Sequence, residues 1–84
     1  MIGIKINPYA GVYKRAVELF NNGYYDEAFT KLSIIVQNDL ENFMANYYIA
    51  ECYFGGYGVS KNYERAFENY IISASQNHIE STYR

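Results

Sequence analysis

Residues 50–66 of the chain read AECYFGGYGVSKNYERA, and this stretch decides the fold. Its central Gly-Gly-Tyr-Gly segment interrupts an apolar run, because glycine loses too much conformational entropy to remain inside a helix. Asn62 follows shortly afterwards and can cap the free backbone N–H groups of a new helix. The stretch therefore predicts one helix that ends near Phe54, a glycine turn, and another helix that begins after Asn62.

Apolar residues at steps of three and four predict four helices in all, because this spacing places them on one helical face. The expected helices extend from Pro8 to Asn22, from Tyr25 to about Asn38, from Leu40 or Asn42 to Phe54, and from Tyr63 to about Asn77. The expected buried faces are Tyr9, Val12, Tyr13, Ala16, Leu19 and Phe20; Tyr25, Ala28, Phe29, Leu32, Ile35 and Val36; Phe43, Tyr47, Ala50 and Tyr53 or Phe54; and Tyr63, Ala66, Phe67, Tyr70 and Ala74. Gly23 and Asn77 are expected to end helices in the left-handed conformation.

The two ends of the chain depart from this helical pattern. Ile2, Ile4 and Ile6 alternate with Gly3 and Lys5, which predicts an extended segment over residues 1–7. That segment can dock on the helices, pair with a second copy, or fray. Residues 79–84 begin another helix, which the end of the sequence cuts short.

Small residues recur at matching places in the helices. Ala16 and Ala50 lie 34 residues apart in the first helices of two pairs, and Ala28 and Ala66 lie 38 residues apart in the second helices. A small side chain at a recurring helical site lets two helices approach closely, and a period in this range is typical of a helical solenoid.

These observations predict an all-α fold with a single domain over residues 1–84. We expect an α-solenoid of two helix-turn-helix repeats, residues 8–38 and 40–77, with four main helices and a truncated third repeat at 79–84.

The second half of the chain resembles a Sel1-like repeat. The likeness covers residues 45–83 and rests on Ala45, Ala50, Tyr53, Gly56, Gly58, Val59, Asn62, Ala66, Tyr70, Ser73-Ala74, Asn77 and Ser81. Residues 12–40 resemble the related tetratricopeptide repeat, through Ala16, Gly23, Tyr25, Ala28 and Leu32. The chain departs from the Sel1 pattern where Asn69 replaces a large aromatic residue, Asn77 replaces a glycine, and Ser73 and Ser81 replace alanines. These departures predict a less tight last interface.

The resemblance implies that the first helix of each pair lines the concave side of the solenoid. Helical spacing then selects the candidate binding residues, which are Tyr13, Val17, Phe20, Asn21, Met44, Tyr47, Tyr48, Glu51 and Phe54. Aromatic residues gathered on a surface are typical of interaction sites. The alternative is that several of these rings fill the core of a small protein.

The sequence offers little for catalysis or metal binding. Cys52 and His78 are the only residues of their types, and a nucleophilic pair needs a third orienting group and a pocket. A metal site needs three or four ligands, so we expect no metal, no cofactor and no enzymatic activity. Cys52 is better explained as a small buried hydrophobic residue and His78 as a polar turn residue.

Charge and composition narrow the class of partner. Seven basic and nine acidic residues give a net charge of −2 without a basic stripe, so a nucleic-acid partner is not expected. No window approaches the roughly 20 apolar residues of a membrane span, so a membrane partner is not expected either. The lone thiol fits a reducing compartment, which favours a cytoplasmic location.

Two functions remain open for such a chain. The first is an interaction module that binds a peptide or a protein surface, through the concave aromatic side, through formation of a homodimer, or both. The alternative is a small inhibitor or immunity-type protein that blocks a partner enzyme or effector by masking its surface. In either case the fourth helix keeps an incompletely covered face, because a solenoid repeat needs neighbours on both sides.

Overall fold

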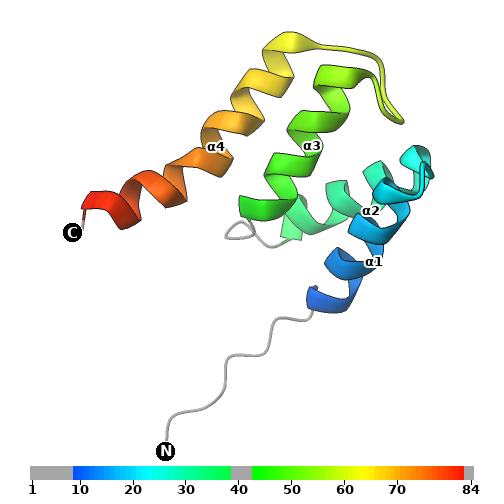
Figure 1. The fold of residues 1–84 in the computed structure, drawn as a ribbon, viewed down its shortest axis with the longest axis horizontal. Coiled ribbons are helices and arrows are strands. Elements are labelled where there is room, and N and C mark those ends of the chain that lie inside the picture. Colours follow the sequence, from blue (N-terminus) through cyan, green and yellow to red (C-terminus); the bar gives the residue numbers. More distant parts are fainter. Residues whose placement is uncertain (1–8, 39–42, 83–84) are drawn as a thin grey trace, which may run out of the picture.

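The computed structural model describes the backbone of residues 9–38 and 43–82, and the side chains of this part as far as residue 75. These residues form four helices and no strand: α1 (Ala10–Asn21), α2 (Tyr25–Asn38), α3 (Phe43–Gly55) and α4 (Tyr63–Thr82). Each helix packs against the next, α1 on α2, α2 on α3 and α3 on α4 (Figure 1). The predicted all-α repeat fold is confirmed.

A glycine turn joins α1 to α2. Gly23 adopts a φ of 88°, the left-handed conformation expected from the sequence. Beyond it, the backbone N–H of Tyr24 donates to the carbonyl oxygen of Leu19 at 2.8 Å, and that of Gly23 donates to Phe20 at 3.1 Å. These bonds satisfy carbonyl groups at the end of α1 and turn the chain back so that α2 packs on α1.

The loop between α3 and α4 ties the second helix pair to the first. Gly56 and Gly58 have φ values of 72° and 73°. A Cβ atom on Gly58 would lie 2.7 Å from the carbonyl carbon of Tyr25 and 3.0 Å from the backbone nitrogen of Asp26. Glycine at position 58 therefore meets two requirements, a left-handed backbone and close approach to the start of α2.

Asn62 caps α4, as the sequence predicts. Its side-chain oxygen accepts the backbone N–H of Arg65 at 3.0 Å. Its own backbone N–H donates to the carbonyl oxygen of Tyr53 at 2.9 Å, so the start of α4 is fixed to the last turn of α3. The cap satisfies one of the backbone donors that every helix leaves free at its N-terminus.

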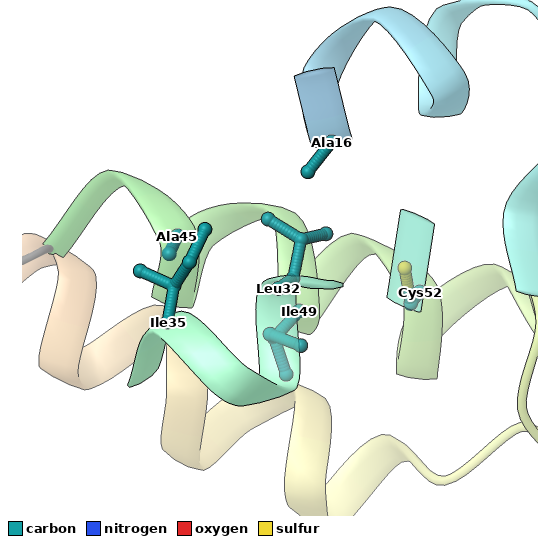
Figure 2. Packing of buried hydrophobic residues seen from close by; sticks show 6 residues of the cluster. All are labelled: Ala16, Leu32, Ile35, Ala45, Ile49 and Cys52. Carbon is teal, nitrogen blue, oxygen red and sulfur yellow. The ribbon is translucent and has the colours of Figure 1, made fainter. Parts of the chain in front are cut away.

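The hydrophobic core lies among the first three helices. The cluster comprises Ala16 of α1, Leu32 and Ile35 of α2, and Ala45, Ile49 and Cys52 of α3 (Figure 2). Each of these side chains is at most 4% exposed. The alanines allow the helix backbones to approach one another, while the leucine and isoleucines supply most of the buried apolar surface.

The faces predicted for α1 and α2 are confirmed. Within these faces α1 buries Ala16 and Leu19 and α2 buries Ala28, Leu32 and Ile35. The other members of the two faces are half-buried.

The face predicted for α3 is correct for Ala50, which is buried, and for Phe43 and Tyr53, which are half-buried, but wrong for Tyr47. Tyr47 and Phe54 are 42% and 56% exposed. The residues that α3 buries are Ala45, Asn46, Ile49, Ala50 and Cys52. Because α3 packs on α2 and on α4, apolar residues surround most of its circumference, and spacing alone cannot select one face.

The face predicted for α4 is also wrong in part. Ala66 is buried, but Tyr63 and Phe67 are 62% and 64% exposed. Among the described elements α4 packs extensively on α3 alone, which leaves part of its apolar surface exposed.

The boundaries differ from expectation at both ends. α1 begins at Ala10, and the predicted extended segment 1–7 lies outside the described residues. α4 continues through Asn77 to Thr82, where the sequence predicts a break and a separate partial helix at 79–84. Asn is a weaker helix terminator than glycine because its side chain makes the left-handed conformation less favourable.

Three alanine substitutions separate the two roles of glycine in this fold. Gly58→Ala should lower the free energy of unfolding most, because it combines left-handed strain with a clash against the backbone of α2. Gly23→Ala should cost about 1 kcal/mol, because nothing lies within 4 Å of its added carbon and only the backbone strain remains. Gly11→Ala, inside α1 and also without a clash, should stabilise the protein by about 0.5–1 kcal/mol. Urea unfolding followed by circular dichroism measures all three, and equal effects at Gly58 and Gly23 would contradict the close packing of the loop on α2.

Candidate protein-binding surface

Aromatic rings connect α1 to α3 on one side of the molecule. Tyr48 of α3 makes edge-to-face contacts with Tyr13 and Phe20 of α1, with ring centroids 6.2 and 5.4 Å apart. All three rings are half-buried and pack against the hydrophobic core. Burial also raises the pKa of Tyr13, with a smaller contribution from Tyr48. These three rings therefore stabilise the packing of α1 on α3, and they also form part of the molecular surface.

The ring cluster continues toward the loop. Phe20 contacts Tyr25 at 5.3 Å and Tyr57 at 5.7 Å. Tyr25 and Tyr57 are stacked, with centroids 4.6 Å apart. Tyr57 belongs to the glycine loop, and sequence analysis did not include it in the candidate surface. Its contacts bring the loop, α1 and α2 together at one corner of the molecule.

The cluster also continues in the other direction, onto α4. Tyr47 contacts Tyr48 at 5.5 Å and Tyr70 at 6.0 Å. The hydroxyl of Tyr70 donates a hydrogen bond to a carboxylate oxygen of Glu51. The pKa of Tyr70 is raised, first by burial and then by this hydrogen bond and the nearby charge of Glu51. The hydroxyl therefore keeps its proton and holds Glu51 against α4.

We call the nine residues selected from the sequence the first-helix surface: Tyr13, Val17, Phe20, Asn21, Met44, Tyr47, Tyr48, Glu51 and Phe54. The structure divides them into two groups. Four are exposed, namely Asn21, Met44, Tyr47 and Phe54, and five are half-buried, namely Tyr13, Val17, Phe20, Tyr48 and Glu51.

The exposed members do not all join the ring cluster. Met44 is 58% exposed and Tyr47 is 42% exposed, both on α3. Phe54 turns toward α4, where its ring centroid lies 5.5 Å from that of Tyr63. Asn21 lies in the last turn of α1. The surface is thus an apolar platform with exposed Met44 and Tyr47 beside one carboxylate, Glu51.

A polar pair buried between α3 and α4 was missed by sequence analysis. Asn46 is 8% exposed, and its side-chain nitrogen donates to the side-chain oxygen of Asn69 at 3.0 Å. Asn69 in turn donates to the backbone carbonyl of Arg65 at 2.9 Å. The departure from the Sel1 pattern at Asn69 therefore has a physical reason, because Asn69 supplies the acceptor for the buried side-chain nitrogen of Asn46.

The described residues contain little that could carry out chemistry. Cys52 is fully buried, and burial raises the pKa of its thiol to about 11, with a smaller contribution from the charge of Glu51. His78 lies in the part of α4 whose side chains are outside the described residues. No group of three or more potential metal ligands occurs within residues 9–38 and 43–75.

Comparison with known protein families agrees with this geometry. Residues 43–78 match the family model of the Sel1 repeat, which spans α3, the glycine loop and most of α4. This segment is therefore similar to a Sel1 repeat. Sel1 repeats generally mediate protein–protein interactions and are typically non-enzymatic. Neither a curated protein nor a solved structure matches the chain in the corresponding searches.

The tetratricopeptide-like character of residues 12–40 and the nine-residue surface stay predictions. Among the helices of the described part, none combines the length and apolar character needed to cross a bilayer.

The buried thiol of Cys52 gives a test of how the core is packed. Thiolate is the reactive form of cysteine, so a pKa near 11 leaves very little of it at pH 8. Labelling of Cys52 by a disulfide reagent at pH 8 should be at least about 100-fold slower in native buffer than in urea, where the pKa returns to about 8.5. Rapid labelling of the native protein would show that Cys52 is not in the core.

Proposed function

We propose that the first-helix surface binds a segment of a protein partner. The observation that carries the proposal is the position of Tyr47, whose ring is 42% exposed and yet contacts Tyr48 on one side and Tyr70 on the other. A ring that is already fixed in place loses little conformational entropy when a partner covers it. Such rings are frequent among the residues that dominate binding energy.

The neighbours of Tyr47 complete a small recognition surface. Met44, which is 58% exposed, lies one turn before it and Glu51 one turn after it on α3. Methionine adapts its shape to apolar partner groups. The carboxylate of Glu51, held by Tyr70, can accept a hydrogen bond from a backbone N–H or a basic side chain. The half-buried Tyr13, Phe20 and Tyr48 support this surface from below.

We also propose a class of partner and a cellular location. Sel1 repeats imply a protein partner, and a cytoplasmic location is supported by the single cysteine, which is buried and free. An adaptor that bridges two proteins leaves both active, whereas a blocking protein abolishes the activity of its target. An activity assay of the captured partner separates these two functions.

The test begins with a phage-displayed peptide library selected on the immobilised protein. The selected peptide should bind Tyr47→Ala at least about tenfold more weakly, a loss of about 1.4 kcal/mol. Tyr24→Ala is a matched control, because Tyr24 is 59% exposed but lies just before α2, outside the surface. Titration calorimetry measures both affinities, and thermal melting confirms that both variants are folded.

Nuclear magnetic resonance then locates the bound peptide. Its largest chemical-shift changes should fall on the amides of Met44, Tyr47 and Glu51. Equal affinity for Tyr47→Ala and the native protein, or shift changes confined to other helices, would contradict the proposed surface.

A further inference from the structure

α4 carries an exposed apolar stripe that lies outside the first-helix surface. Tyr63, Phe67 and Ile71 are 62%, 64% and 52% exposed, and Ala74 is exposed as well. Steps of four, four and three residues place them along one side of the helix. The side of α4 that faces α3 carries other residues, among them the buried Ala66 and the hydrogen-bonded Asn69 and Tyr70. Figure 1 shows α4 at the end of the helical array, with α3 beside it.

The internal repeat indicates what such a stripe accepts. The 38-residue offset between Ala28 and Ala66 places Tyr25, Phe29 and Val36 of α2 at the positions of Tyr63, Phe67 and Ala74. In α2 these residues are half-buried.

The second helix pair covers that face of α2. Phe29 contacts Tyr53 of α3 at 5.5 Å, Tyr25 stacks on Tyr57 of the following loop, and Val36 packs on the core. One helix of the α3 type and its loop therefore cover this set of positions in α2. At the same positions in α4, Tyr63 contacts Phe54 of α3, but Phe67 and Ala74 are exposed and no helix or loop of this kind covers them among the described residues. The stripe can therefore accept one helix.

The first helix of a second copy does not fit this stripe. The 34-residue offset between Ala16 and Ala50 places Lys14, Arg15 and Glu18 of α1 at the positions of Tyr48, Ile49 and Cys52 of α3. All three charged side chains are exposed, and Arg15 lies 3.5 Å from Glu18. Covering α4 with this side of α1 would remove charges from water against an apolar stripe, which is strongly unfavourable.

An antiparallel pairing of two α4 helices is also disfavoured by charge. Glu64 and Glu68 each follow a member of the stripe by one residue, so they lie along one edge of it. In an antiparallel pair related by a two-fold axis, these acidic edges would face each other. The nearby cation Arg65 is engaged elsewhere, with its guanidinium carbon 5.9 Å from the centre of the Tyr53 ring. The edge therefore favours a partner with positive charge.

We propose that the stripe Tyr63–Phe67–Ile71 is the docking site for an amphipathic helix of a different protein. That helix carries apolar residues at steps of three and four and lysine or arginine along the edge that meets Glu64 and Glu68. It occupies the place on α4 that α3 occupies on α2. This inference does not depend on binding at the first-helix surface.

The probe is a synthetic amphipathic peptide of about 18 residues, with leucine along one face and lysine along both edges. Two control peptides have the same leucine face with glutamate edges, or the same composition in scrambled order. The lysine-edged peptide should bind the intact chain at least tenfold more tightly than either control. Fluorescence anisotropy of labelled peptides measures the three affinities.

Variants of α4 then assign the binding to the stripe. Phe67→Ser should weaken the lysine-edged peptide at least tenfold while the protein stays folded, because the ring is 64% exposed. The double variant Glu64→Lys and Glu68→Lys should reverse the preference toward the glutamate-edged peptide. Tyr47→Ala should leave binding unchanged, which separates this site from the first-helix surface.

Two results would overturn the proposal. The first is equal binding of the lysine-edged and scrambled peptides, or binding that Phe67→Ser does not weaken. The second is a stable dimer of the free chain in analytical ultracentrifugation that Phe67→Ser dissociates, because a second copy would then occupy the stripe. We expect a monomer at high micromolar concentration.

Discussion

Leu32 and Ile35 of α2 pack against Ala45 and Ile49 of α3, and this contact makes one core from two helical hairpins. A chain of 84 residues buries a small share of its surface, so it has little stability to spare. Each of these large side chains contributes about 1.5–3 kcal/mol when fully buried. The alanines opposite them are fully buried and keep the helices close. Without this contact, neither hairpin would have enough apolar surface to fold alone.

The position of this core makes the two ends of the molecule different. α1 turns Ala16 and Leu19 inward and leaves Lys14, Arg15 and Glu18 in water, so its outer side is polar. α4 buries Ala66 but leaves aromatic and aliphatic residues exposed. The two outer helices of the described structure therefore differ, because α1 presents a polar side and α4 an apolar side. Tyr70 of α4 contacts Tyr47 of the ring cluster. Both proposed binding surfaces therefore include residues of the segment that matches the Sel1 repeat.

Local signals in the sequence were sufficient for the Gly23 turn, for the Asn62 cap and for the buried faces of the first two helices, but not for the break predicted at Asn77. Gly23 and Asn62 act through their own backbone or side chain, and no distant residue is needed to predict them. The faces of α1 and α2 follow from spacing because the aligned apolar residues all meet one core. The alanines at 16, 28, 50 and 66 are all buried, as their recurrence suggested.

The remaining features depend on which helices are neighbours. α3 packs on two sides, so its buried Ala45, Ile49 and Cys52 could not be distinguished from its exposed Tyr47 by spacing. From the sequence, the apolar side of α4 was predicted to face the core. In the described structure no further helix packs on this side, so Phe67 is exposed. The sequence places Tyr47 both on the expected core face of the third helix and in the candidate surface, and its ring is 42% exposed, whereas Tyr48 is a half-buried packing residue. Its partners Tyr13 and Phe20 come from another helix, and sequence spacing cannot show such a contact.

The measurement that tests the shared core most directly is hydrogen exchange of the native protein and of Ile35→Val. The substitution removes one methylene group from the contact between α2 and α3 and should cost about 1 kcal/mol. If one core joins the two hairpins, the opening free energies of the slowest amides in α1, α2 and α3 fall together by this amount. A loss confined to α1 and α2, with the amides of α3 unchanged, would contradict the account, because the hairpins would then fold as separate units.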